Sequence, residues 1–186
     1  MLRTARALTA VSLLSLLHVG LAHSAASADR DALRKQAVQA LAELTRAVPA
    51  ARRLAASAHA VLVFPRVTQA GLVVGGQYGE GVLLRKGRVL GFYNIVGASY
   101  GLQAGAQRYG QALFFMNAEA LAYLDRSDGF ELGMGPSLVV VDEVKARTMT
   151  TTTLNDDIYG FAFGQRGMML SMALRGNKIN RLAAEE

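Results

Sequence analysis

The chain has 186 residues, 52% of them hydrophobic, so it can form one domain with a real core and is too short to presume two. This composition excludes a disordered chain, and the absence of cysteine excludes disulfides and a cysteine-linked lipid anchor. The net charge is +6, but residues 29–110 hold eleven Lys/Arg against four Asp/Glu, whereas residues 111–186 hold seven against ten. This asymmetry favours a basic face that meets an anionic partner.

The first 28 residues have the pattern of a secretory signal peptide. Arg3 and Arg6 precede an apolar run, residues 7–17, and the small residues Ala26-Ser27-Ala28 form a cleavage site. The alternative is an uncleaved membrane anchor, but His18 interrupts the run before the roughly 18–20 residues that a span needs. We therefore expect a periplasmic or secreted protein that is peripheral to the membrane and is not a lipoprotein.

Apolar residues at helical spacing predict a helix from Asp29 to Val48, and Pro49 either breaks this pattern or opens a second helix that ends near Ala58. The apolar stripe consists of Leu33, Ala37, Leu41, Leu44 and Val48. Because it lacks an aromatic anchor, packing on a sheet is favoured over insertion into a membrane. The cations on these helices are Arg30, Arg34, Lys35, Arg46, Arg52 and Arg53.

Residues 61–110 contain eleven of the chain's 19 glycines between β-branched and aromatic residues, which predicts a cluster of short strands. The predicted strands are Val61 to Phe64, closed by Pro65, then Gly71 to Tyr78, Gly81 to Arg85, Arg88 to Val96, Ser99 to Gln107 and Gln111 to Met116. The third and fourth strands form a hairpin through Lys86-Gly87. Clean alternation from Ser99 to Gln107 indicates a strand with two different faces.

The last third of the chain continues this pattern. Asn117 is the predicted N-cap of a helix to about Arg126. The predicted strands are Leu138 to Val141, Ile158 to Phe163 and Gly167 to Leu174, and Thr148 to Thr153 is either an edge strand or a loop. Residues 29–186 are therefore predicted to form one α+β domain, an antiparallel sheet with N-terminal helices and one crossover helix. A partly closed barrel is one form that such a sheet can take.

No catalytic or cofactor constellation emerges from the sequence. The glycine motif of residues 75–81 lacks the strand-to-helix context of a dinucleotide fingerprint. His59 has no nearby acid and nucleophile, and neither Ser99 nor Ser137 lies in a nucleophile elbow. Asn155-Asp156-Asp157 lacks the ligand ladder of a calcium loop, so it predicts a turn or cap. We expect no enzyme, no cofactor and no metal site.

The turn Arg85-Lys86-Gly87-Arg88 is the strongest candidate site, because it carries three cations within four residues. An anionic membrane surface offsets their mutual repulsion by roughly 1 kcal/mol per charge. A solvated hairpin tip is the alternative. Secretion disfavours nucleic acid as a partner, and the sequence offers no platform of aromatic and basic residues on which bases could stack.

Four ordered motifs resemble the SYLF domain family, and the similarity covers the chain from about Arg30 to Arg181. The motifs are Ala60-Val61-Leu62-Val63-Phe64-Pro65, Gly75-Gly76-Gln77-Tyr78-Gly79-Glu80-Gly81, Ser99-Tyr100-Gly101-Leu102-Gln103-Ala104-Gly105-Ala106-Gln107 and Asp157-Ile158-Tyr159-Gly160-Phe161. This family includes lipid-binding, actin-patch-associated proteins of fungi and animals and many secreted bacterial proteins. Its eukaryotic members bind phosphoinositide-containing membranes, so the resemblance implies a lipid-binding domain.

By position, the resemblance implies lipid contacts for the cations of the helical region, Arg34, Lys35, Arg46, Arg52 and Arg53. It does not imply actin association for a chain with a secretory signal. Ser171 and Arg175 depart from the family pattern, which more often has glycine and an acid at these positions.

The sequence thus predicts a domain that binds anionic phospholipid headgroups or membranes through these helical cations and through Arg85, Lys86 and Arg88. One alternative is an envelope module that meets a protein partner and has no lipid activity. Another is an outer-membrane barrel, which the apolar residues on both faces of several strands disfavour.

Overall fold

The computed structural model describes residues 27–71, 74–100, 105–126, 130–131, 135–141, 155–164 and 177–183. The chain divides into two compact units, residues 1–33 and 34–186, and the sheet belongs to the second. The predicted signal peptide lies in the first unit, and its residues 1–26 are outside the described residues. The predicted segments Thr148 to Thr153 and Gly167 to Leu174 are also outside them.

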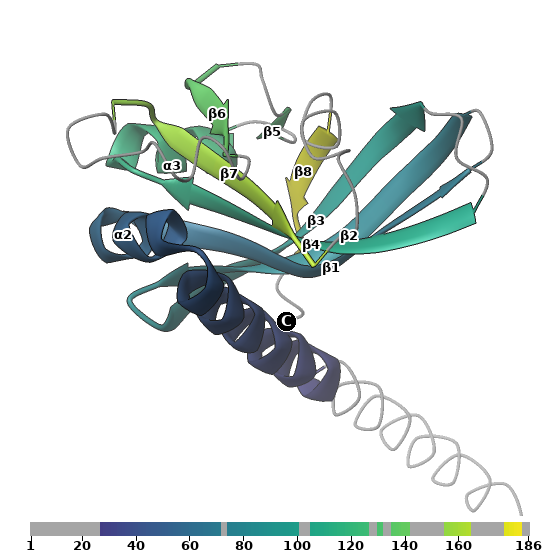
Figure 1. Cartoon of the computed structure of the whole chain (residues 1–186), viewed down its shortest axis with the longest axis horizontal. Coiled ribbons are helices and arrows are strands. Elements are labelled where there is room, and N and C mark those ends of the chain that lie inside the picture. The colour runs from purple at the N-terminus through teal and green to yellow at the C-terminus, as the bar shows by residue number, and fades with distance from the viewer. Residues whose placement is uncertain are drawn as a thin grey trace, which may run out of the picture. The chain divides into compact units, whose positions relative to one another are not determined.

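The described residues form helices at 27–47, α2 (Pro49–Ser57) and α3 (Ala118–Arg126). The strands are β1 (Ala60–Gly71), β2 (Val74–Arg85), β3 (Arg88–Tyr100), β4 (Gly105–Phe115), β5 (Phe130–Glu131), β6 (Leu138–Val140), β7 (Ile158–Phe163) and β8 (Asn177–Arg181). These strands form one curled sheet in the order β5-β8-β3-β2-β1-β4-β7-β6 (Figure 1). Every neighbouring pair is antiparallel except β6 and β7. The predicted α+β class, dominated by an antiparallel sheet, is confirmed.

Pro65 does not end β1, contrary to the sequence prediction. The pairing of β1 shifts between Val63 and Arg66 against β2, and between Phe64 and Val67 against β4. Proline has no N–H to donate, so it fits inside a paired strand at a bulge of this kind. β1 therefore continues past the bulge to Gly71.

Two other predicted strand boundaries are wrong. Gly81 to Arg85 is not a separate strand, because β2 runs unbroken through Gly79 and Gly81, which lie against Val67 and Phe64 of β1. The predicted strand Ser99 to Gln107 is divided between the end of β3 and the start of β4. These two strands lie on opposite sides of the β1-β2 pair.

The central strands have two buried faces, because successive side chains point to opposite sides of a sheet. The inner face carries a core cluster that includes Leu62, Phe64 and Ile95 and that meets Leu121 and Leu124 of α3. The outer face carries the intervening apolar residues, among them Val61, Val63, Val82, Leu84, Ala112 and Phe114. Residues 34–47 of the first helix and α2 lie on the outer side of the curled sheet, and α3 lies on the inner side (Figure 1).

The start of α3 is joined to β6 and β7 by one carboxylate. Asn117 caps the helix as predicted, since its Oδ1 accepts a hydrogen bond of 2.8 Å from the N–H of Ala120. Asp157 Oδ1 accepts from Asn117 Nδ2 at 2.7 Å, and Asp157 Oδ2 accepts from the backbone N of Ser137 at 2.9 Å and from its Oγ at 3.0 Å. The hydrogen bonds from Ser137 and Asn117 lower the pKa of Asp157.

We expect Asp157→Asn to lower the free energy of unfolding at neutral pH by about 1 kcal/mol, because hydrogen bonds to a charged carboxylate are the stronger ones. The pKa of Asp157 is lower in the folded chain than in the unfolded chain. Its contribution is therefore present above the unfolded pKa and is lost as the pH falls through the folded pKa. Urea unfolding from neutral to acidic pH should show the difference between wild type and variant shrinking. A difference that stays constant with pH would contradict the role of the charge.

Candidate functional site

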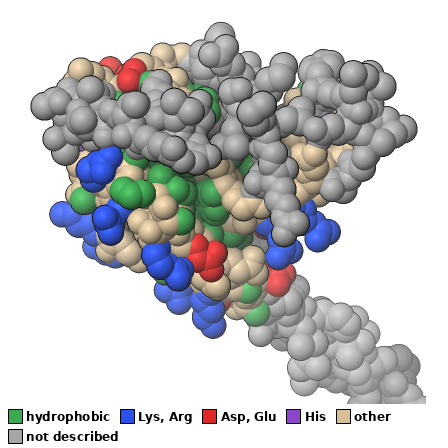
Figure 2. All heavy atoms as spheres, viewed as in Figure 1, with side chains coloured by type: hydrophobic (Ala, Val, Ile, Leu, Met, Phe, Trp, Pro, Cys, Tyr) green, Lys and Arg blue, Asp and Glu red, His purple; other side chains and the backbone are tan. Residues whose placement is uncertain are grey.

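The helical cations predicted as site residues all lie on the solvent-exposed side of their helices. Arg34, Lys35, Arg46, Arg52 and Arg53 are exposed. The residues that the same helices bury are Ala37, Ala40, Leu44, Ala50, Ala51 and Leu54. Ala37 and Leu44 of the predicted stripe are therefore buried within the domain, and Leu33, Leu41 and Val48 are half-buried. Figure 2 shows Lys and Arg side chains gathered over this part of the molecule.

The β2-β3 turn adds a second group of cations beside the helices. Lys86 has a φ of 48° and Gly87 a φ of 79°, and positive φ at both central residues is the requirement of a type I′ hairpin. Arg85 Nε donates a hydrogen bond of 3.1 Å to the carbonyl oxygen of His59, at the junction between α2 and β1. The predicted hairpin is confirmed, and Arg85 links it to the segment between α2 and β1. Arg85, Lys86 and Arg88 are all exposed.

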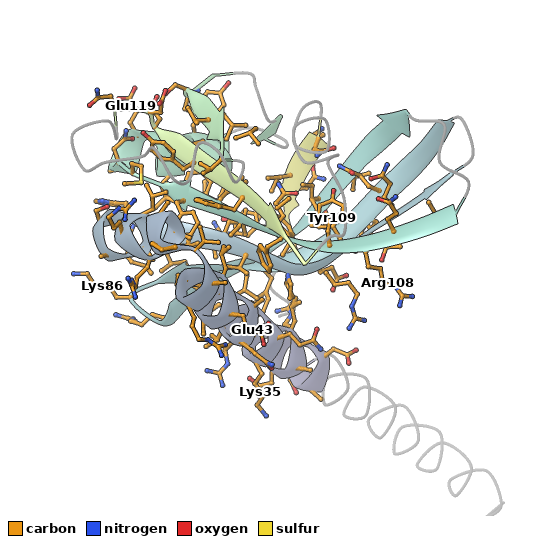
Figure 3. All side chains as sticks on the ribbon, viewed as in Figure 1. Lys35, Glu43, Lys86, Arg108, Tyr109 and Glu119 are labelled. Atoms are coloured by element: carbon orange, nitrogen blue, oxygen red, sulfur yellow. The ribbon has the colours of Figure 1, made fainter. Side chains whose placement is uncertain are left out.

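Besides Arg181, which pairs with Asp125, the strands contribute three cations that the sequence analysis missed: Arg66, Arg108 and Lys178. Each is exposed and directly adjoins an inner-face residue, Val67, Tyr109 or Ile179. Because neighbouring residues of a strand point to opposite sides, these cations lie on the outer face. Figure 3 shows Arg108, Lys35 and Lys86 projecting on the same side of the sheet. Alternation along each strand could have shown on which face each cation lies. The sequence did not show which strands pair, and so which cations share a surface.

The acidic side chains are distributed differently. Glu119 and Asp125 lie on α3, on the inner side, and Figure 3 places Glu119 away from Lys35 and Lys86. Asp125 Oδ1 accepts hydrogen bonds from Tyr93 Oη at 2.7 Å and from Arg181 Nη1 at 3.0 Å, so this acid is paired. Burial, and then the hydrogen bond to Asp125, raise the pKa of Tyr93.

Two acids, Glu43 and Glu80, accompany the outer-face cations among the described residues of the second unit. Glu43 Oε1 accepts a hydrogen bond of 2.9 Å from Gln39 Nε2, and Glu80 Oε1 accepts one of 2.7 Å from Tyr78 Oη. Cations from the helices, the turn and the strands outnumber these two acids. The basic outer face is defined as the group Arg34, Lys35, Arg46, Arg52, Arg53, Arg66, Lys86, Arg108 and Lys178, with Arg85 and Arg88 flanking the β2-β3 turn at its edge.

The inner face carries a small buried network of neutral polar groups. Gln77 Nε2 donates to Asn177 Oδ1, and Tyr109 Oη donates to Gln77 Oε1 at 2.9 Å. Burial raises the pKa of Tyr109 to about 12, so this phenol keeps its proton at neutral pH. The fully buried side-chain amide of Gln111 makes no hydrogen bond to the described residues. These groups can exchange hydrogen bonds, but they provide no nucleophile paired with a base.

The structure also describes the surroundings of residues that the sequence analysis considered as catalytic or metal-binding candidates. His59 is exposed, and its backbone N–H donates to the carbonyl of Phe115 at 2.7 Å. Ser137 is hydrogen-bonded to Asp157, and the chain bends at residues 156 and 157. Within the described ranges, no group of three or more His, Asp or Glu side chains could hold a metal ion. The side chain of Ser99 and the residues Ser171 and Arg175 lie outside what the structure describes.

The fold and the site together define an α+β domain whose curled sheet carries a basic outer face and, on its inner face, a buried network of neutral polar groups. No protein-family model matches the chain, and no curated protein matches it either. The resemblance to the SYLF family therefore rests on the four sequence motifs. Across the described residues, none of the helices combines the length and the apolar character that a membrane crossing requires.

Proposed function

We propose that this protein is a lipid-binding domain that associates with anionic phospholipid headgroups or membranes through its basic outer face. The observation that carries this proposal is the convergence of cations from the helices, the β2-β3 turn and three strands on one side of the sheet. Each Lys or Arg near an anionic membrane contributes roughly 1 kcal/mol of attraction. The SYLF resemblance supports the same class of partner. The predicted signal peptide supports a periplasmic or secreted location, peripheral to the membrane.

The proposed contact is electrostatic and lies at the headgroups. The apolar residues Ala37, Leu44 and Leu54 are buried in the domain, so the helices cannot insert these side chains into lipid without unpacking. Their exposed arginines can bind phosphate oxygens through two N–H groups at once, and the lysines act as point charges. Because salt screens exposed charges over about 10 Å at 0.1 M, the proposed binding weakens as salt is added.

We expect the double variant Lys86→Glu, Arg88→Glu to bind anionic vesicles at least about 30-fold more weakly, since it removes two attractions of roughly 1 kcal/mol each. Arg85 is left unchanged because it bonds to His59 and helps to hold the turn. The measurement is flotation with vesicles of phosphatidylcholine alone or mixed with phosphatidylglycerol, at low and high salt. Wild-type binding should need the anionic lipid and should decrease in high salt.

A charge-swap variant tests whether the face or only the net charge matters. Lys86→Glu combined with Glu119→Lys keeps the net charge and moves one cation to the opposite side of the sheet. Weaker binding supports the basic outer face, whereas unchanged binding would show that net charge alone is responsible. If the wild-type protein floats with no vesicle at any salt concentration, the proposal fails, and the alternative of an envelope module with a protein partner takes its place.

A further inference from the structure

A row of five side chains crosses the outer face of the sheet from β4 to β8. The strand pairing aligns Arg108 with Thr68, Thr68 with Tyr78, Tyr78 with Val96, and Val96 with Lys178. We call these residues the outer-face strip. Neighbouring strands are about 4.8 Å apart, so the four spacings from β4 to β8 make the strip roughly 19 Å long. Arg108 and Lys178 form its cationic ends, and the large apolar side chains of Tyr78 and Val96 lie between them, next to Thr68.

The two central side chains are unusually exposed for their type. Tyr78 is 48% exposed and Val96 is 43% exposed, whereas Val82 on the same face of β2 is fully buried. The adjacent row, towards the ends of the strands, consists of the small exposed residues Ala70, Gly76 and Ala98. Among the described side chains, Tyr78 and Val96 therefore stand above a row of small residues on that side.

Tyr78 combines an apolar ring with a fixed hydroxyl. Its Oη donates a hydrogen bond of 2.7 Å to Glu80 Oε1, and this bond, together with burial, raises the pKa of Tyr78 to about 12. The phenol is therefore uncharged at neutral pH. Tyrosine with one apolar and one hydrated end is the kind of side chain that is enriched at membrane interfaces.

We infer that the outer-face strip is a second lipid contact, in which Tyr78 and Val96 enter the interfacial layer while Arg108 and Lys178 bind phosphates on either side. This inference rests on the proposed function and extends it to residues outside the helices and the turn. A lipid surface fits better than a protein because both ends of the strip are cationic, and because Arg108 projects on the same side as Lys35 and Lys86 (Figure 3). Glu80 is an acid on the same face of β2, and the Tyr78 hydroxyl donates a hydrogen bond to it.

The chain contains no tryptophan, so a single introduced tryptophan reports on one place. Val96→Trp should float with anionic vesicles, and its emission should shift to the blue and be quenched by brominated lipid. Glu119→Trp, on the inner side, is the matched control and should float without either change. A shift at both positions, or at neither, during flotation overturns the inference and leaves the proposed function standing. Absence of flotation in the wild-type protein overturns both.

A second variant avoids any disturbance that the large tryptophan causes in the sheet. Val96→Thr keeps a β-branched side chain, which suits a strand, and Tyr78→Ser removes the ring. The double variant Tyr78→Ser, Val96→Thr should bind anionic vesicles about tenfold more weakly, because it loses apolar area that leaves water on binding. Its salt dependence should match that of the wild type, since no charge changes. Unchanged affinity in a folded double variant contradicts the role of the strip.

Discussion

Phe114→Ala should lower the free energy of unfolding by about 3–5 kcal/mol, the usual cost of removing a fully buried phenylalanine. Phe114 lies in β4 on the outer face of the sheet and has no exposed surface. Its ring meets that of Phe161 edge-on, with centroids 5.4 Å apart and planes at 77°. Alanine would remove this contact and leave a cavity in the packed outer face, which the rigid sheet can close only in part.

Urea unfolding followed by circular dichroism measures this loss, and Phe114→Leu serves as the control. Leucine fills most of the space, so its cost should be clearly smaller. If Phe114→Ala and Phe114→Leu have equal effects, the ring is not packed as described. A loss below about 1 kcal/mol for the alanine variant would lead to the same conclusion.

Gly81→Ala should destabilise the protein by about 1–3 kcal/mol, because an added Cβ overpacks the contact between β2 and β1. That Cβ would lie 2.5 Å from Phe64 Cδ1 and 2.7 Å from the carbonyl oxygen of Val63. The Phe64 ring can shift only within a filled core, and the Val63 carbonyl belongs to a paired strand. The glycine at this position therefore allows the close approach of two strands.

Gly76→Ala is the matched control, because it places the same methyl group in the same strand. The nearest atom to its Cβ is the carbonyl oxygen of Gly97, at 4.0 Å, so we expect a change within about 0.5 kcal/mol. Urea unfolding of the two variants side by side tests the difference. Equal stabilities would mean that β2 and β1 do not approach each other closely at Gly81. The glycine motif of residues 75–81 is thus explained in part by strand packing, which agrees with the absence of a phosphate-loop context.

Features set by neighbouring residues were predicted correctly. Pro49 starts α2, because its fixed φ suits the first turn of a helix. Lys86-Gly87 forms the hairpin turn, since glycine adopts positive φ without strain. Asn117 caps α3 through its own side chain. In each case a few adjacent residues provide the physical cause, so one stretch of sequence was sufficient.

Features that depend on distant partners were missed or misplaced. Pro65 predicted the end of a strand, but pairing with both β2 and β4 continues beyond a bulge. The alternation of Ser99 to Gln107 matched a single strand, although the two ends belong to β3 and β4. A pattern of period two shows which residues share a face, and it does not show where one strand ends and another begins.

The sequence by itself determined the sheet-dominated α+β class, the local turns and caps, and the presence of exposed cations on the helices and on the β2-β3 turn. Only the tertiary structure decided which of these groups share a surface. Arg108 and Lys178 are 70 residues apart, and the pairing of five strands places them at the two ends of one row around Tyr78 and Val96. Composition and periodicity are properties of neighbouring residues in the sequence. The basic outer face instead results from hydrogen-bonded pairing between strands that are far apart in the sequence.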